Sequence, residues 1–125
     1  MTATQTVLFV CLHGAGMSRM AAAYFNRAAP ADWRAVSAGL EPAETLSSTA
    51  ASLLAGTGAE EFLDHAPPRP IGGVPDPLRV IALRNPAIQY ELGPAEYWDL
   101  SQSAGVPLRE EIRQRAEALA ESIDS

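Results

Sequence analysis

The pattern of apolar and polar positions opens with a buried strand that leads into a helix. An uninterrupted apolar run covers residues 7–10, which is typical of a strand buried on both faces. A short loop with two glycines follows, and from Met17 to Ala28 the apolar residues recur at helical spacing. The sequence therefore predicts a strand, a loop that starts at Cys11 and a helix that begins near Met17.

Strand and helix patterns continue to alternate along the rest of the chain. Strands are predicted at residues 33–39, 78–83 and 97–100. Helical segments are predicted from a cap at Ser47 or Ser48 through Leu54, at residues 60–64 and at residues 106–123. Proline-containing loops or irregular segments occupy residues 66–77 and 84–96. This alternation predicts a parallel sheet with both faces covered.

The only cysteine of the chain stands where the first strand meets the loop. Backbone N–H groups at the start of a helix can bind an anion, and the helix dipole favours a thiolate, the nucleophilic form of cysteine. Binding crevices of parallel sheets open at the C-terminal ends of the strands, where Cys11 falls. The sequence predicts an anion-binding loop beside a nucleophilic Cys11. The alternative is a small buried cysteine without reactivity.

The composition of the chain argues against several classes of partner and site. The 125 residues carry a net charge of −6, which argues against nucleic acid and anionic membranes as partners. No apolar run approaches the length of a membrane span, and the N-terminus lacks the pattern of a secretory signal. One cysteine and two distant histidines do not make a metal site, and a single cysteine fits a reducing compartment. We expect one cytoplasmic domain over residues 1–125.

Residues 9–22 resemble the catalytic loop of the low-molecular-weight protein tyrosine phosphatases and of the arsenate reductases that share their fold. This chain has FVCLHGAGMSRMAA, whereas the actinobacterial arsenate reductase branch often has FVCVHNAGRSQMAA. Residues 37–42 (SAGLEP) and 107–116 (PLREEIRQRA) are similar to SAGTEP and RPIRDEIRxRV of that branch, so the resemblance spans nearly the whole chain. It implies a bacterial protein with a three-layer α/β sandwich around a central four-stranded parallel sheet.

Key positions of the family are changed in this chain. The loop asparagine is Gly14, the arginine that holds the oxyanion is Met17, and the general-acid aspartate is Gln102. Methionine has neither a charge nor a donor, and glutamine cannot transfer a proton at neutral pH. The resemblance therefore implies the family's fold combined with little phosphatase activity.

Other side chains near the loop admit two interpretations each. Ser18 bonds the thiolate in the family, but it can also be an ordinary helix residue. His13 either stabilises a thiolate or an anion, or it points outward. Arg19 is a candidate substitute for the lost arginine, yet a helix turns it about 200° from residue 17, which predicts that it faces solvent. By the family layout, the pocket rim consists of Arg84, Tyr97, Trp98 and Gln102, although such aromatic residues are more often part of a core.

These residues favour a binding protein over an enzyme. In this interpretation a small oxyanion, a small molecule or a protein partner binds the loop formed by Leu12, His13, Gly14, Ala15, Gly16 and Met17, without a cofactor or metal. The alternative is a cysteine-dependent enzyme that uses Cys11 with Ser18: an arsenate reductase, a weak phosphatase or an enzyme of another reaction. A reductase would need an external thiol such as mycothiol, because a single cysteine excludes an internal relay. A third function is a pure interaction protein whose pocket is closed by Met17. We expect a monomer or a weak homodimer.

Overall fold

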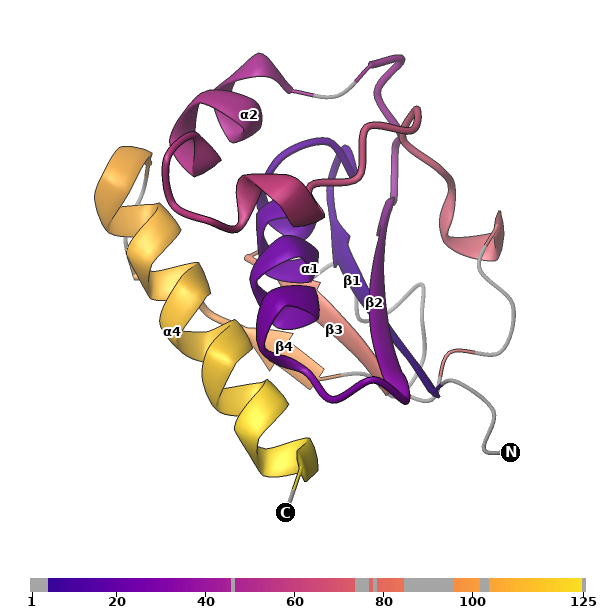
Figure 1. Cartoon of the computed structure of the whole chain (residues 1–125). Helices are drawn as coiled ribbons and strands as arrows, with labels where there is room; N and C mark the ends of the chain where they lie inside the picture. Colours follow the sequence, from indigo (N-terminus) through magenta and orange to yellow (C-terminus); the bar gives the residue numbers. More distant parts are fainter. Residues whose placement is uncertain are drawn as a thin grey trace.

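The computed structural model describes residues 5–45, 47–73, 77, 79–84, 96–101 and 104–124. In chain order, its elements are β1 (Gln5–Cys11), α1 (Met17–Ala28), β2 (Trp33–Gly39), α2 (Ser48–Leu54), the 3₁₀ turns η1 (Glu60–Phe62) and η2 (Ile71–Gly73), β3 (Arg79–Leu83), β4 (Glu96–Trp98) and α4 (Gly105–Asp124). The predicted order of strands and helices is confirmed (Figure 1). Most of the predicted irregular segment 84–96 lies outside the described residues.

The four strands form one parallel sheet in the order β2-β1-β3-β4. β1 is central, because it pairs with β2 along its whole length and with β3 over Val7–Val10. This position explains the apolar run of β1, because a central strand of a parallel sheet is buried on both faces. The predicted α/β fold with a four-stranded parallel sheet is confirmed.

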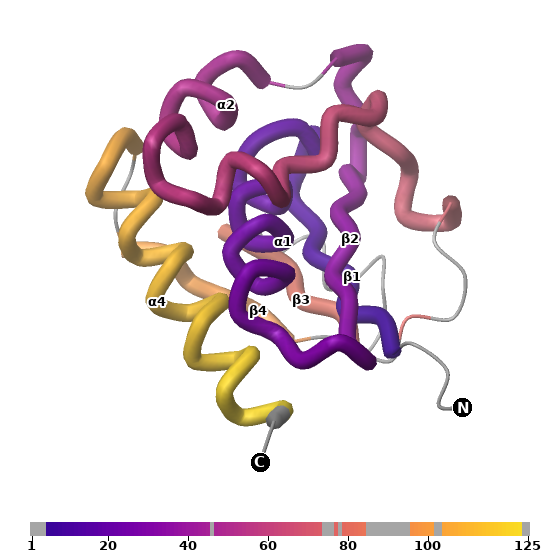
Figure 2. The backbone as a smooth tube through the Cα atoms, viewed as in Figure 1, coloured from indigo at the N-terminus to yellow at the C-terminus, as the bar shows by residue number. Residues whose placement is uncertain are grey.

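The two faces of the sheet have different coverings. Val7 and Phe9 point into a large core that also holds buried side chains of α1, α2 and α4, so these helices share one face. Figures 1 and 2 show α1 and α4 side by side over the sheet. Leu8 and Val10 point to the opposite face, where Ile71 of η2 packs against their cluster. Alternate residues of β1 therefore serve two layers, as the period of a strand requires.

The C-terminal part follows the predicted pattern with shifted boundaries. In α4, the predicted stripe of Leu108, Ile112, Ala116 and Leu119 is buried in the core, and the helix runs one residue further at each end than predicted. β4 is shorter than predicted and pairs with β3 only over Ile81–Leu83. None of the described helices is both long enough and apolar enough to cross a membrane.

Candidate functional site

The loop after β1 lies at the C-terminal edge of the sheet. Cys11 is the last residue of β1 and pairs with Gly39 of β2, while α1 begins at Met17. Because β1 is central, the loop that follows it lies between the C-terminal ends of β2 and β3. The predicted arrangement of central strand, loop and helix start is therefore what the structure has.

The backbone of the loop directs its carbonyl groups toward the protein. The carbonyl oxygens of residues 11, 12, 13 and 15 accept hydrogen bonds from the N–H groups of Leu40, Glu41, Ala43 and Ser47, at 3.1, 2.7, 3.1 and 3.0 Å. The Gly16 carbonyl accepts from Met20 N–H at 3.0 Å. Across the part of the chain that the structure describes, the N–H groups of residues 12, 13 and 15–17 have no protein acceptor. Such a run of free amides before a helix can bind an anion.

The Cys11 thiol has two hydrogen-bond partners, one donor and one acceptor. Cys11 is 3% exposed. The Gly14 N–H donates to Cys11 Sγ at 3.3 Å, and the thiol donates to Ser18 Oγ at 3.1 Å. A thiolate would accept from both groups, because a serine hydroxyl can rotate to donate. The structure thus places Ser18 against the thiol, the position that the family resemblance implied.

A cavity of about 240 Å³ opens above the thiol. Its lining consists of Cys11, Leu12, His13, Ala15, Gly16, Met17 and Ser47. Met17 is half-buried and packs against the main core as well. Ser47 was predicted only as a helix cap, yet its side chain makes no capping hydrogen bond and its N–H holds the loop. No signal in the sequence connects Ser47 with the loop, because the connection is formed by backbone atoms.

Gly14 and His13 occupy opposite sides of the loop. Gly14 is buried with φ of +65°, a conformation that suits glycine, and a Cβ there would lie 2.6 Å from Gly39 N. His13 is exposed at the mouth, and its Nδ1 lies 3.1 Å from the Glu41 carbonyl oxygen. The imidazole therefore points outward, although His13 is one of the residues that line the cavity.

The prediction that Arg19 faces solvent is wrong. The residue is 1% exposed. Its Nε donates to the Gly14 carbonyl at 2.9 Å, and its Nη1 donates to the Asp64 carbonyl. The connection after α2 packs Ala59 and Leu63 into the core against α1, and this covers the side of the helix that was expected to be wet. Burial lowers the pKa of Arg19, while the Asp64 carboxylate and, more weakly, the Cys11 thiolate act in the opposite direction.

Asp64 joins Arg19 to a second arginine. Its Oδ2 accepts from Arg69 Nη2 at 2.9 Å, and its Oδ1 accepts from Ala66 N–H at 2.9 Å and lies 4.0 Å from Arg19 Nη1. Burial raises the pKa of Asp64, but these hydrogen bonds and the two positive charges outweigh it, so the pKa lies below its usual range. Arg69 in turn donates to the Ser37 carbonyl at 2.8 Å.

This network makes part of the stability dependent on pH. The folded-state pKa of Asp64 is below the ordinary value of 3.8, so its stabilisation is complete above that pH and is lost as pH falls further. We expect acid to destabilise the wild type more than Asp64→Asn. The difference should be under about 1 kcal/mol, because the pair with Arg69 is partly exposed. Urea unfolding between pH 2 and 7 measures it. Parallel curves for the two proteins would contradict the expectation.

The structure describes three of the four rim residues that the family layout implies. Trp98 is 9% exposed and packs against Phe9 with the ring centroids 5.3 Å apart. Tyr97 points to the other face and donates its hydroxyl to the Arg84 carbonyl. Strand alternation separates these two neighbours, and the described lining of the cavity includes none of the three. Gln102 lies outside the described residues.

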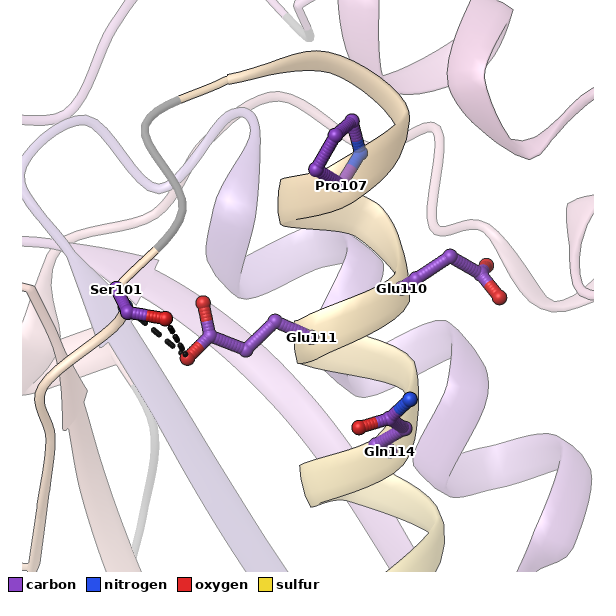
Figure 3. Close-up of a pocket in the computed structure, with 5 residues that line it drawn as sticks. All are labelled: Ser101, Pro107, Glu110, Glu111 and Gln114. Carbon is purple, nitrogen blue, oxygen red and sulfur yellow. Dashed lines mark hydrogen bonds between the residues drawn. The ribbon is translucent and has the colours of Figure 1, made fainter.

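A second hollow lies at the start of α4. It encloses about 390 Å³ and is lined by Ser101, Pro107, Glu110, Glu111 and Gln114. Glu111 reaches across it and accepts from the Ser101 N–H at 3.0 Å and from its hydroxyl at 3.1 Å (Figure 3). Glu110 pairs with Arg109 and Arg113. Because both carboxylates of this hollow already have partners, it is a weaker candidate for a binding or catalytic site than the loop cavity.

Among the described residues, no group of His, Cys, Asp and Glu side chains could hold a metal ion. The described polar groups at the loop cavity include its free amides, the Cys11 thiol with the Ser18 hydroxyl beside it, and Ser47.

Comparisons with known proteins find the same fold among solved structures. No family model and no curated protein sequence matches the chain. Among solved structures, the arsenate reductase of Archaeoglobus fulgidus matches 92% of this chain and 98% of its own, with 28% identity and a TM-score of 0.70. The thioredoxin-dependent arsenate reductase of Corynebacterium glutamicum is 25% identical with a TM-score of 0.69, over 98% of this chain and 63% of its own.

A low-molecular-weight protein tyrosine phosphatase of Streptococcus pyogenes shares the fold at lower identity. Its TM-score is 0.77 at 12% identity, over 98% of this chain and 95% of its own. The fold of this chain is thus found both in arsenate reductases and in a low-molecular-weight protein tyrosine phosphatase. By its sheet, its cysteine loop and these structural matches, the chain has the fold that low-molecular-weight protein tyrosine phosphatases and arsenate reductases share, and it is similar to arsenate reductases at 25% and 28% identity.

Proposed function

We propose that this chain is a degenerate member of its family that binds a small oxyanion, or a ligand with an anionic group, in the loop cavity and has little phosphatase activity. The observation that carries the proposal is the combination of free loop amides with Met17. The amides of residues 12, 13 and 15–17 lack protein acceptors among the described residues, while Met17 lines the cavity where the family has its arginine.

The two halves of this observation have different consequences. Backbone amides do not depend on side-chain identity, so they support anion binding in any loop of this conformation. Catalysis by the family needs a planar, charged, bidentate donor on the transition-state oxygens, and methionine supplies no donor. A site that has the free amides but lacks the charged donor is expected to bind an anion and to catalyse its reaction poorly.

A cysteine-dependent enzyme is the second candidate, and the contacts of Cys11 favour it. Gly14 N–H and Ser18 Oγ lie 3.3 and 3.1 Å from the sulfur, where both can stabilise a thiolate. Arsenate reduction would then require an external thiol such as mycothiol together with a redoxin, because Cys11 is the only cysteine. We expect a cytoplasmic monomer or weak homodimer in either case.

The binding half is tested by sulfate titration. Sulfate should bind the wild type weakly, and Met17→Arg should bind it tenfold to a hundredfold more tightly, because a charged hydrogen bond contributes about 1.5–3 kcal/mol. Isothermal calorimetry or thermal shift of the full chain measures the affinities.

Met17→Gln is the matched control, since glutamine adds a donor at the same position without a charge. It should gain much less than Met17→Arg. Absence of any sulfate binding in both the wild type and Met17→Arg would contradict the proposal and would mean that the loop amides do not form an anion site.

A further inference from the structure

Arg19 stands behind the loop, on the side away from the cavity. It is the largest fully buried side chain among the described residues, and it does not belong to the described lining of the cavity. Its Nε bonds the carbonyl oxygen of Gly14, a residue that is itself buried and also outside the lining. A buried cation is costly unless it is paired, so its presence at this place needs an explanation.

One residue connects this cation to the thiol. The carbonyl of Gly14 accepts from Arg19 Nε at 2.9 Å, and the N–H of Gly14 donates to Cys11 Sγ at 3.3 Å. Gly39 contacts the loop from the β2 side, where it leaves no space for a Cβ on either glycine. The orientation of Gly14 is therefore determined by Arg19 on one side and by Gly39 on the other.

The surroundings leave an excess of positive charge behind the loop. The Asp64 carboxylate is shared, since it lies 2.9 Å from Arg69 Nη2 and 4.0 Å from Arg19 Nη1. In addition, Arg19 Nη2 is buried without a hydrogen-bond partner among the described residues. The ring of His13 faces outward to the Glu41 carbonyl, and β2 places the uncharged Gly39 opposite Cys11. Arg19 is thus the charged group that reaches the thiol most directly.

We infer that Arg19 is a positioning residue of the loop: it holds the Gly14 peptide with its N–H toward Cys11 and favours the thiolate from behind the cavity. This inference deepens the proposed function, because it rests on the same loop being the binding site. Arg19 does not replace the family arginine as a contact to the ligand. Its guanidinium binds the Gly14 carbonyl oxygen, so its positive charge lies behind the loop and not in the cavity.

The rate of Cys11 alkylation by iodoacetamide tests this role in the full-length protein. Arg19→Met should lower the rate at neutral pH about tenfold and move the pH profile to higher pH, because the thiolate loses a nearby cation and an oriented donor. Arg19→Lys keeps the charge and should recover part of the rate. Arg27→Met is the matched control: Arg27 is an exposed arginine of the same helix that donates to the Thr57 carbonyl at 2.9 Å. It should stay within about twofold of the wild type.

Asp64→Asn distinguishes charge from simple loosening. It removes the negative charge beside Arg19 while keeping an oxygen that can accept from Arg69, so alkylation should become two- to threefold faster. A folded Arg19→Met protein with an unchanged pH profile would overturn the inference. If Arg19→Met does not fold, an Asp64→Asn protein that reacts more slowly than the wild type would overturn it instead. Absence of sulfate binding by both the wild type and Met17→Arg would contradict the proposed function alone, since alkylation does not require an anion.

Discussion

Hydrolysis of p-nitrophenyl phosphate by this protein is expected to proceed near the uncatalysed rate. Removing one preorganised charged donor typically costs about 3–4 kcal/mol of transition-state stabilisation, or two to three decades in rate. Absence of a general acid typically costs about two to four further decades. With Met17 lining the cavity and Gln102 in the aligned position of the acid, both costs apply.

The double variant Met17→Arg/Gln102→Asp tests whether these two positions account for the deficit. It should gain several decades of turnover over the wild type, whereas Met17→Arg alone should bind anions better and still hydrolyse slowly. Cys11→Ser in the double variant should abolish the gain, since serine at this position lacks the thiolate. Initial rates at saturating substrate measure all four proteins.

An efficient wild-type enzyme would contradict this expectation. If its turnover matched that of ordinary phosphatases and disappeared in Cys11→Ser, another residue would have taken over from the arginine. Arg19 is already bonded to Gly14 and Asp64, and the ring of His13 points outward. A substitute would then require a rearranged loop.

The strand, loop and helix around Cys11 could be predicted from the sequence because local rules determine them. The short apolar run of residues 7–10 indicates a buried strand, and the helical spacing after it starts at the observed residue, Met17. The positions of Cys11 and Ser18 relative to each other follow from the loop motif. Their contact at 3.1 Å therefore comes from features that lie within eight residues of the chain.

The role of Arg19 could not be predicted from helical geometry alone. The prediction that Arg19 points away from Met17 was correct, because a helix turns two such positions to opposite sides. Helical geometry does not say which other segment covers the side of the helix that carries Arg19. The covering segment includes Asp64, which is distant in the sequence and lies just after the short η1 turn, although the sequence predicted it inside a helical segment. Ser47 was missed for a similar reason, because it meets the loop through its backbone N–H.

The contact between Gly14 and Gly39 is another feature that the sequence hides. In the sequence the two glycines belong to separate local patterns, Gly14 to the loop and Gly39 to the end of β2. In the structure the C-terminal edge of β2 supports the loop, and a Cβ on Gly39 would lie 2.5 Å from His13 C and 2.7 Å from Gly14 N. These are backbone atoms, so the neighbour cannot move aside by a change of rotamer.

Gly39→Ala should therefore displace the loop and abolish sulfate binding. Inserting a methyl group into a packed site typically costs about 1–3 kcal/mol, and a backbone neighbour places this case toward the upper end. The displaced loop also loses the Gly14 N–H contact to Cys11 Sγ, so alkylation of the thiol should slow as well. Urea unfolding, sulfate calorimetry and the alkylation rate together measure the three effects.

Gly72→Ala is the control for Gly39→Ala, because a Cβ at Gly72 meets nothing within 4 Å and the residue lies in η2, away from the loop. It should change the free energy of unfolding by less than about 0.5 kcal/mol, as surface substitutions usually do, and leave sulfate binding intact. Equal sulfate affinity in Gly39→Ala and Gly72→Ala would contradict the expected role of the glycine contact. It would mean that the loop keeps its conformation when the methyl group pushes β2 away, and that Arg19 and the four hydrogen bonds from residues 40–47 hold the loop without Gly39.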